Sequence, residues 1–192
     1  MQKKGITVAI TGGIGSGKSH VCRILQQKGI DVYDCDEAAK RLMRDDPSLQ
    51  TALKQQIGPH VYVDNVLQKA VLAQFILASE ANKQKVNDIV HPAVAADFLQ
   101  SAYTWIESAL LFDAHFDKRV HPDKVICVSA PYELRLERIM NRDAISCEKA
   151  AEWIERQMSQ EEMLQRSDYE IKNDGQHDLQ QQIEQIVKTL TT

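Results

Sequence analysis

The stretch that decides the fold is Gly12-Gly13-Ile14-Gly15-Ser16-Gly17-Lys18-Ser19, which matches the pattern G-x-x-x-x-G-K-[ST] at every fixed position. A β-branched run at 6–11 precedes it, and apolar residues at helical spacing follow it until Gly29, a predicted C-terminal cap. In this order, a strand, a glycine turn and a helix N-terminus bring backbone N–H groups and a partial positive charge to one point. The stretch therefore predicts a site for the phosphates of a nucleoside triphosphate, against the alternative of a glycine-rich turn without a ligand.

Two side chains of this stretch have predicted roles, since Lys18 can reach the β- and γ-phosphates and the Ser19 hydroxyl can ligate Mg²⁺. A phosphate site alone does not separate a kinase from a GTPase. No Asp stands three residues before a Gly, and Asn82-Lys83-Gln84-Lys85 lacks a closing Asp, so the GTPase motifs D-x-x-G and N-K-x-D are absent. A small-molecule kinase would instead need a carboxylate near the acceptor hydroxyl and arginines near the phosphates.

Composition excludes several other classes of protein. The 192 residues are 43% hydrophobic, which suffices for a sizeable core, and the net charge of −4 argues against general nucleic-acid binding. None of the four cysteines has C-x-x-C spacing, and Cys22 and Cys127 are predicted to be buried free thiols. We find neither a signal sequence nor a transmembrane stretch, and we expect a soluble, cytoplasmic protein.

Alternating strand and helix patterns predict an α/β fold. The expected strands of a mainly parallel, five-stranded sheet are 6–11, 30–34, 104–111, 124–129 and 168–172. We expect one domain of the P-loop NTPase type over 1–192, with its nucleotide-binding core at 1–46 and 101–192. Residues 47–100 break the alternation and read as an inserted helical substrate module, or as a plain crossover with extra helices. A helical lid is expected at about 141–165.

Helix boundaries have their own signals. Pro131 is expected in the first turn of a helix through Ile139, and Ser146 is a candidate N-cap of a helical segment that reaches Met163. Apolar residues at 179–190 predict a C-terminal amphipathic helix. The pair His91-Pro92 is typical of the end of a helix.

Candidate catalytic side chains follow the second predicted strand. Asp34 and Asp36 stand at its carboxyl end, where α/β sheets bind ligands, and they share one side if the strand continues that far. Asp36 also precedes a helical pattern, so capping and catalysis are both open for it. Arginines that suit bidentate phosphate capture flank a predicted helix–loop–helix, although a solvated charged face would look the same. They are Arg135, Arg138, Arg142 and Arg156.

Taken together, the motifs resemble those of the bacterial dephospho-coenzyme A kinase family along nearly the whole chain. The similar segments, in order, are 11–19 (T-G-G-I-G-S-G-K-S), 32–36 with Ala39 (V-I-D-A-D-x-x-A), Gly58 with 64–69 (D-G-x-L-x-R), 89–92 (I-x-H-P), 107–113 (D-I-P-L-L-F-E), 138–143 (R-x-x-x-R-D) and 157–158 with 166–173 (Q-M … R-A-D-Y-x-I … N).

The resemblance implies that the γ-phosphoryl group of ATP is transferred to the ribose 3′-hydroxyl of dephospho-CoA, the last step of coenzyme A biosynthesis. It implies catalytic roles for Asp36 as the base, Lys18 and Arg142. The implied ATP-binding residues are Gly13, Ile14, Gly15, Ser16, Gly17, Lys18, Ser19, His20, Arg138, Arg142 and Asn173, the last near the adenine. The implied substrate-binding residues are Asp36, Lys40, Lys69, His91 and Leu111. Mg²⁺ would be held by Ser19 and, through water, by Glu107.

Several positions depart from the family pattern. Glu107 and Asp113 exchange its Asp and Glu, Ala109 replaces a proline, and His20 replaces a threonine. Lysines at 40 and 69 replace arginines and lack the two-pronged contact.

The expected partners are ATP and dephospho-CoA, with no nucleic acid and no membrane, and the chain is expected to be a monomer or a weak homo-oligomer. The alternatives are another P-loop kinase acting on a nucleotide, gluconate or shikimate, and a non-catalytic ATP-binding regulatory module.

Overall fold

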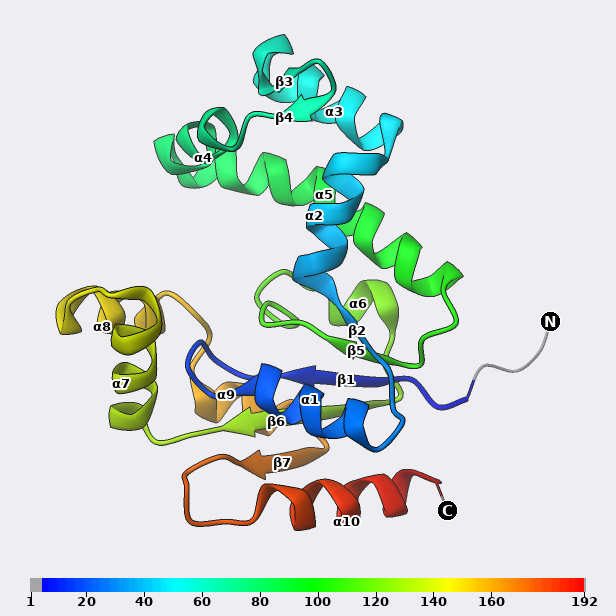
Figure 1. The fold of residues 1–192 in the computed structure, drawn as a ribbon, viewed down its shortest axis with the longest axis vertical. Coiled ribbons are helices and arrows are strands. Elements are labelled where there is room, and N and C mark those ends of the chain that lie inside the picture. Colours follow the sequence, from blue (N-terminus) through cyan, green and yellow to red (C-terminus); the bar gives the residue numbers. More distant parts are fainter. Residues whose placement is uncertain (1–4, 192) are drawn as a thin grey trace. The chain divides into compact units, whose positions relative to one another are not determined.

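The computed structural model describes residues 5–191, which divide into two compact units (Figure 1). The first unit contains the chain up to Tyr33 and from Ala102 onward, and the second is Asp34–Ser101. The ends of the predicted core, residues 1–4 and 192, lie outside the described residues.

The first unit is built on a five-stranded parallel sheet, as predicted. In spatial order its strands are β2 (Val32–Asp34), β5 (Trp105–Glu107), β1 (Val8–Thr11), β6 (Lys124–Ser129) and β7 (Tyr169–Lys172). Val8, Ala9 and Ile10 of the central strand are fully buried, as expected for a strand covered on both faces. In the register of the sheet, Ile10 faces Glu107 on one side and Thr11 faces Cys127 on the other. The segments that follow β1, β5 and β6 therefore start at one edge.

The predicted strand at 104–111 continues four residues too far at its carboxyl end, because β5 (Trp105–Glu107) stops at Glu107. Ser108 still donates its N–H to the Ile10 carbonyl at 3.0 Å, but the chain then turns back on itself. The N–H groups of Ala114 and Phe116 donate to the carbonyls of Leu110 and Leu111, so the backbone there is no longer extended. The apolar residues 109–112 continue the pattern of a strand, and an apolar run does not show where the backbone turns.

Six helices of the described residues belong to the first unit. They are α1 (Lys18–Gln27), α6 (Asp117–Val120), α7 (Tyr132–Asp143), α8 (Cys147–Glu155), α9 (Gln160–Gln165) and α10 (Leu179–Thr191). Side chains of α1 and α10 share one apolar core with β1, β6 and β7, so these two helices pack on the sheet together (Figure 1). Gly29 follows α1 with a φ of 80°, which confirms it as the left-handed residue that ends this helix.

The helices between β6 and β7 begin where capping residues allow. Pro131 is the N-cap of α7 and not a residue of its first turn, because its ψ of 144° is extended. The Ser146 hydroxyl accepts the Lys149 N–H, which confirms the predicted N-cap of α8. The single helix predicted to reach Met163 is wrong: α8 ends at Glu155, and Ser159 caps a separate helix, α9. A second serine cap offers the backbone a new start that helical periodicity does not reveal.

The second unit is mainly helical. Its elements are α2 (Cys35–Asp45), α3 (Pro47–Ile57), the 3₁₀ turn η1 (Pro59–Val61), β3 (Tyr62–Val63), β4 (Val66–Leu67), α4 (Lys69–Ala78) and α5 (Glu80–Gln100). It begins at Asp34, earlier than the insertion predicted at 47–100, because α2 packs on α5. An ion pair of 2.6 Å between Arg41 and Asp97 joins these two helices. Asp64 and Asn65, which form the hairpin turn between β3 and β4, both have positive φ, as a tight primed turn requires.

Helix α5 runs through Pro92, so the expected helix end at His91 is wrong. Buried side chains on both sides of the proline, from Val86 to Phe98, hold the two halves of the helix against the rest of the unit. Packing of this kind outweighs the hydrogen bond that a proline removes. None of the helices in the described range combines the length and the apolar character needed to span a membrane.

Candidate active site

The loop 12–19, called the phosphate loop below, connects β1 to α1 and has the backbone of an anion site. Gly12, Gly15 and Gly17 have φ values of 144°, 79° and 93°, in the region that favours glycine. Within residues 5–191, the N–H groups of Gly15, Gly17 and Ser19 donate to no protein acceptor. Converging N–H groups at the start of a ten-residue helix attract phosphate oxygens. The predicted cradle is therefore present in the structure.

The glycines of the phosphate loop are also required by close neighbours. A Cβ at Gly12 would collide with the Val128 carbonyl, and one at Gly17 would collide with the side-chain amide of Asn173. The first neighbour is backbone of β6, which cannot move without disturbing the sheet. Gly17 also has a left-handed φ, so an alanine there would be disfavoured both by the collision with Asn173 and by its backbone conformation.

We expect Gly17→Ala to lower the free energy of unfolding by about 2 kcal/mol or more, through strain and through displacement of Asn173. Gly29→Ala is the matched control, because Gly29 has a φ of 80° but nothing within 4 Å of the added Cβ. The control isolates the strain of the backbone alone, about 1 kcal/mol. Urea unfolding of both variants measures the difference, and equal losses would show that crowding at Gly17 contributes nothing.

The ammonium group of Lys18 is held in place by the loop itself. Its Nζ donates to the carbonyls of Gly12 and Gly13 at 2.8 and 3.4 Å, and the residue is only 9% exposed. Burial raises the pKa of the neighbouring Cys127 thiol to about 12, with the charge of Glu170 acting in the same direction and Lys18 opposing it. Cys127 therefore stays a neutral thiol beside Lys18.

Two buried hydroxyls mark the polar character of this edge of the sheet. Thr11 Oγ1 and Ser16 Oγ are inaccessible to solvent and have no hydrogen-bond partner among the described residues. Buried hydroxyls without partners cost free energy that polar ligand atoms could recover. The site thus fits a polyphosphate better than an apolar ligand.

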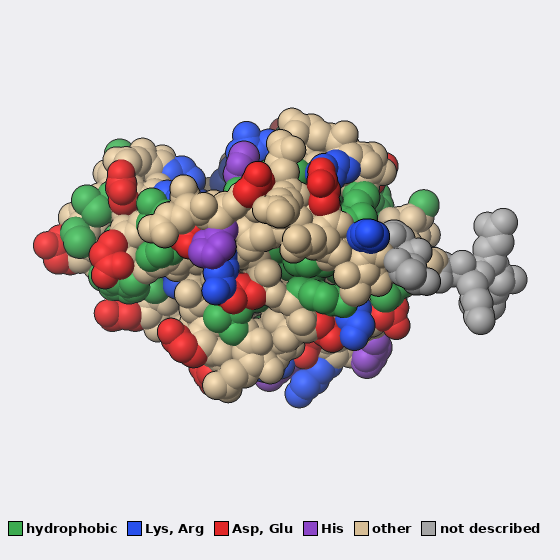
Figure 2. Space-filling view, turned by 90° about the horizontal axis from the view of Figure 1, so that it is seen from below, with side chains coloured by type: hydrophobic (Ala, Val, Ile, Leu, Met, Phe, Trp, Pro, Cys, Tyr) green, Lys and Arg blue, Asp and Glu red, His purple; other side chains and the backbone are tan. Residues whose placement is uncertain are grey.

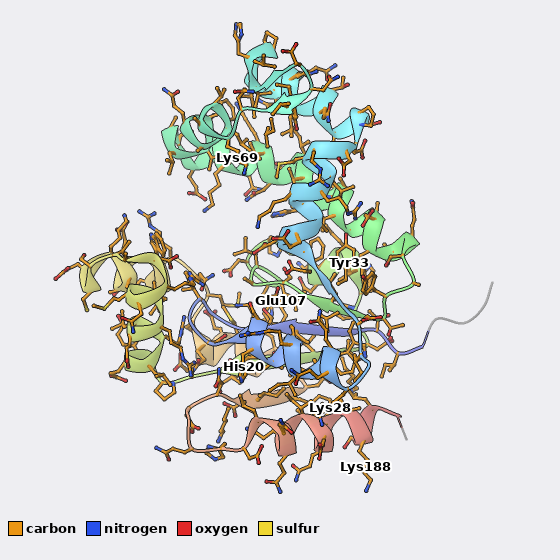
Figure 3. The ribbon with its side chains drawn as sticks, viewed as in Figure 1. His20, Lys28, Tyr33, Lys69, Glu107 and Lys188 are labelled. Carbon is orange, nitrogen blue, oxygen red and sulfur yellow. The ribbon has the colours of Figure 1, made fainter. Side chains whose placement is uncertain are left out.

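Both predicted magnesium ligands, Ser19 and Glu107, belong to the first unit and offer oxygen atoms. The Ser19 hydroxyl is exposed in the first turn of α1 and has no protein partner in the described range. Glu107 is half-buried at the end of β5, opposite Ile10 of β1 (Figure 3). No group of three potential metal-ligating side chains exists among residues 5–191. This sparse oxygen set fits Mg²⁺, which keeps much of its water and takes ligands from phosphates.

Arg138 and Asn173 contact the phosphate loop from its carbonyl side. Arg138 Nη1 donates to the carbonyls of Gly15 and Ser16 at 3.2 and 3.3 Å, and Nη2 donates to the Asn173 carbonyl at 3.1 Å. The Asn173 amide donates to the Ser16 carbonyl at 2.7 Å. Both side chains thus brace the second half of the loop, which adds a supporting role to the phosphate and adenine roles predicted for them.

A cavity of about 390 Å³ opens beside Asn173. His20 and Arg23 of α1 line one side of it, and Gly175 and His177 line the other (Figure 3 shows His20 on α1). The His20 N–H donates to the Gly17 carbonyl at 3.0 Å, so it is already used in starting the helix. Its imidazole is exposed.

Acidic and basic side chains are interspersed on the face of the molecule that includes α10 (Figure 2).

Two other predicted residues of the first unit do not contact the phosphate loop through hydrogen bonds. Arg142, in the last turn of α7, donates through Nε and Nη2 to Asp143 at 3.0 and 2.7 Å, and its side chain is 60% exposed. Leu111 is fully buried, and its carbonyl accepts the N–H groups of Phe116 and Asp117. Asp113 accepts the Met158 N–H at 3.0 Å.

In the second unit, Asp34 and not Asp36 caps helix α2. Asp34 Oδ1 accepts the N–H groups of Asp36 and Glu37 at 2.9 and 3.0 Å, so the capping interpretation of Asp36 is wrong. The strand also ends at Asp34, so the two carboxylates are not related by strand alternation. Within the described residues, the exposed Asp36 carboxylate accepts no hydrogen bond and makes no ion pair. With the cap assigned to Asp34, the carboxylate of Asp36 is available for chemistry.

The remaining substrate candidates lie on three helices of this unit. Lys40 follows Asp36 by one turn of α2, and its Nζ is 2.7 Å from Glu37 Oε1. Lys69 is the exposed first residue of α4 (Figure 3), and His91 is half-buried in α5.

Two residues that contact the phosphate loop were not predicted as site residues. Arg135 Nε donates to the Ile14 carbonyl at 2.9 Å, and Gln157 Oε1 accepts the Ile14 N–H at 2.7 Å. The sequence predicts Arg135 only as one of four arginines that flank a helix–loop–helix. Gln157 belongs to the segment 157–158 that resembles the family, but nothing in that segment reveals a partner 143 positions away.

Comparisons with known proteins identify the family to which the chain belongs. The family model described as dephospho-CoA kinase matches residues 6–178. Dephospho-CoA kinases of Bacteroides fragilis and Porphyromonas gingivalis are 38% and 39% identical to the chain, covering 96% and 97% of it and 93% and 95% of their own lengths. The crystal structure of TT1252 from Thermus thermophilus has a TM-score of 0.82 at 28% identity, covering 99% of this chain and all of that one. A shikimate kinase from Acinetobacter baumannii, at 12% identity and a TM-score of 0.60 over 98% of this chain and 94% of its own, shares the fold. The chain therefore belongs to the dephospho-CoA kinase family.

Proposed function

We propose that this protein transfers the γ-phosphoryl group of ATP to the ribose 3′-hydroxyl of dephospho-CoA, giving coenzyme A and ADP. The observation that carries the proposal is the phosphate loop with Lys18 Nζ fixed on the Gly12 carbonyl, in a chain of this family. Donors that are held in place before the reaction stabilise charge without reorganisation, which suits a reaction whose barrier is mainly electrostatic.

The residues of the first unit would bind the triphosphate. The N–H groups of the phosphate loop would hold the β-phosphate, and Lys18 would neutralise charge on the β- and γ-phosphates. Arg142, exposed at the end of α7, would reach the transferred phosphoryl group from the lid, for which we propose residues 141–165. We propose Asn173 and the adjoining cavity as neighbours of the adenine.

Ser19 and Glu107 would hold Mg²⁺, the second of them through water. When bound, the ion supplies charge neutralisation between the β- and γ-phosphates. The hydroxyl of Ser19 would be oriented by the first turn of α1, and Glu107 by the register of β5 on β1.

The residues of the second unit would bind and activate the acceptor. Asp36 follows the last residue of β2 by two positions, and α/β sheets bind ligands at the carboxyl ends of their strands, which supports this role. Its carboxylate would accept the proton of the attacking 3′-hydroxyl. Lys40, Lys69 and His91 would contact dephospho-CoA as residues of the inserted module, while buried Leu111 would support the site from within the first unit. We propose that the reaction occurs in the cytoplasm, on a monomer or weak homo-oligomer.

The test incubates purified protein with Mg²⁺-ATP and, separately, dephospho-CoA, shikimate, gluconate and a nucleoside monophosphate. We expect ADP to form with dephospho-CoA alone, and the product to be coenzyme A by mass. ADP formation with another acceptor would assign a different kinase activity. ATP binding without ADP formation would assign a regulatory module.

A further inference from the structure

The peptide groups of Ile14 are held from both directions by residues far away in the sequence. Gln157 Oε1 accepts the Ile14 N–H at 2.7 Å, and Arg135 Nε donates to the Ile14 carbonyl at 2.9 Å. The Ile14 side chain packs against a small apolar cluster of α7 and α8, built on Ile139 and Ile154. One residue of the phosphate loop is therefore fixed through its donor, its acceptor and its side chain.

The two halves of the phosphate loop are held by different residues. Arg138 and Asn173 hold the carbonyls of Gly15 and Ser16 in the second half. In the first half, Lys18 Nζ donates to the carbonyls of Gly12 and Gly13, and the two peptide groups of Ile14 are held by Arg135 and Gln157. A displacement at Ile14 would move Gly13 and Gly15 as well, since both are its covalent neighbours.

Arg135 is a costly side chain to bury, which argues that it has a function. It is 5% exposed, and no carboxylate within the described residues lies at ion-pair distance from it. Burial lowers the pKa of its guanidinium, an effect that the charge of Glu161 offsets only in part, and neighbouring Cys127, whose thiol pKa is raised by burial, supplies no counter-charge. An apolar residue of this size would pack at lower cost. The arginine at this position is therefore explained by the hydrogen bond it makes.

Gly13 lies directly against the side chain of the same arginine. A Cβ at Gly13 would collide with Nη2 and lie 2.8 Å from Cζ of Arg135. The φ of Gly13 is not in the left-handed region, so backbone conformation does not explain this glycine. The close approach of the Arg135 guanidinium explains why position 13 is a glycine.

We propose that Arg135 and Gln157 are positioning residues that fix the two peptide groups of Ile14 and thereby set the shape of the phosphate loop for ATP. Neither residue touches the reacting atoms. Both act through the loop backbone, and they act on the same residue. The inference uses the proposed function only in taking ATP as the ligand of the phosphate loop.

The experiment measures ATP affinity by calorimetry and turnover by ADP release for Arg135→Met, Gln157→Leu and the double variant. We expect each single change to weaken ATP binding about tenfold and to lower kcat, as for displaced positioning groups, with an unchanged KM for the acceptor. Because both residues hold Ile14, the double variant should lose less than the product of the single losses. Arg119→Met is the matched control, since it removes the same charge from an exposed residue of α6, in the same unit, that has no role in the proposed site.

Arg135→Gln distinguishes the hydrogen bond from the charge. Its amide can still donate to the Ile14 carbonyl, so we expect ATP affinity within about threefold of the unchanged protein. If Arg135→Gln is as impaired as Arg135→Met, the charge and not the hydrogen bond matters, and the proposal is wrong. Normal ATP affinity and kcat in folded Arg135→Met and Gln157→Leu would also overturn it. ATP affinity does not depend on the acceptor, so these results are separate from a failure of dephospho-CoA to react.

Discussion

Replacing Lys18 with alanine should lower turnover by at least about a hundredfold, the loss typical of removing one fixed charge-stabilising donor. Lys18 is only 9% exposed, and its ammonium group is held by the carbonyls of Gly12 and Gly13 before any ligand arrives. In such a site water cannot replace the lost charge at low cost. Single-turnover kinetics with saturating ATP measure the chemical step, and circular dichroism checks that the variant is folded.

Lys28→Ala is the control for this prediction. Lys28 follows α1, the helix that Lys18 begins, and its Nζ pairs with Glu184 at 2.5 Å on the surface. The variant loses the same unit of charge, but exposed pairs contribute little, and we expect turnover within about twofold of the unchanged protein. Retention of more than a tenth of the turnover in folded Lys18→Ala would contradict the assigned role.

How much the sequence predicts depends on the distance over which each contact is made. The phosphate loop was predicted because all its requirements lie close together in the sequence, within residues 8–29, from the buried run of β1 to Gly29. The five strands were predicted because central parallel strands are continuously apolar. Strand β5 was extended too far because an apolar run does not show where the backbone turns after Glu107.

Local capping was predicted only where one candidate was available. Ser146 is followed by a clear helical pattern and was identified correctly. At 34–36 two aspartates compete for the same N-cap, and sequence alone left Asp36 open between capping and catalysis. The structure decides because Asp34 has the extended backbone that a cap requires, with a ψ of 111°.

Long-range support of the phosphate loop could not be predicted. The contacts of Ile14 with Arg135 and Gln157 span 121 and 143 positions. Arg138 was expected at the phosphates, but the structure also shows its guanidinium on the loop carbonyls and on Asn173. An arginine has five N–H donors, so one side chain can support the backbone and still meet a ligand, and no spacing rule shows how the donors are divided.

Replacing Asp36 with asparagine should lower turnover by about a hundredfold, the low end of what a general base contributes. The low end applies because a loose phosphoryl-transfer transition state needs little help in removing the proton. The phosphate loop binds ATP without Asp36, so the affinity for ATP should stay within about twofold. Isothermal calorimetry and steady-state kinetics on one preparation separate the two quantities.

Asp34→Asn is the matched control for the Asp36 variant, because the two changes remove the same charge from the same end of α2. Asparagine is as good an N-cap as aspartate, so the bonds from the N–H groups of Asp36 and Glu37 should persist and turnover should be retained. Asp34→Ala should instead lower the free energy of unfolding by about 1 kcal/mol, because those two N–H groups lose their acceptor. If Asp36→Asn and Asp34→Asn lose the same small amount of activity, Asp36 supplies only surface charge, and another group must accept the proton of the 3′-hydroxyl.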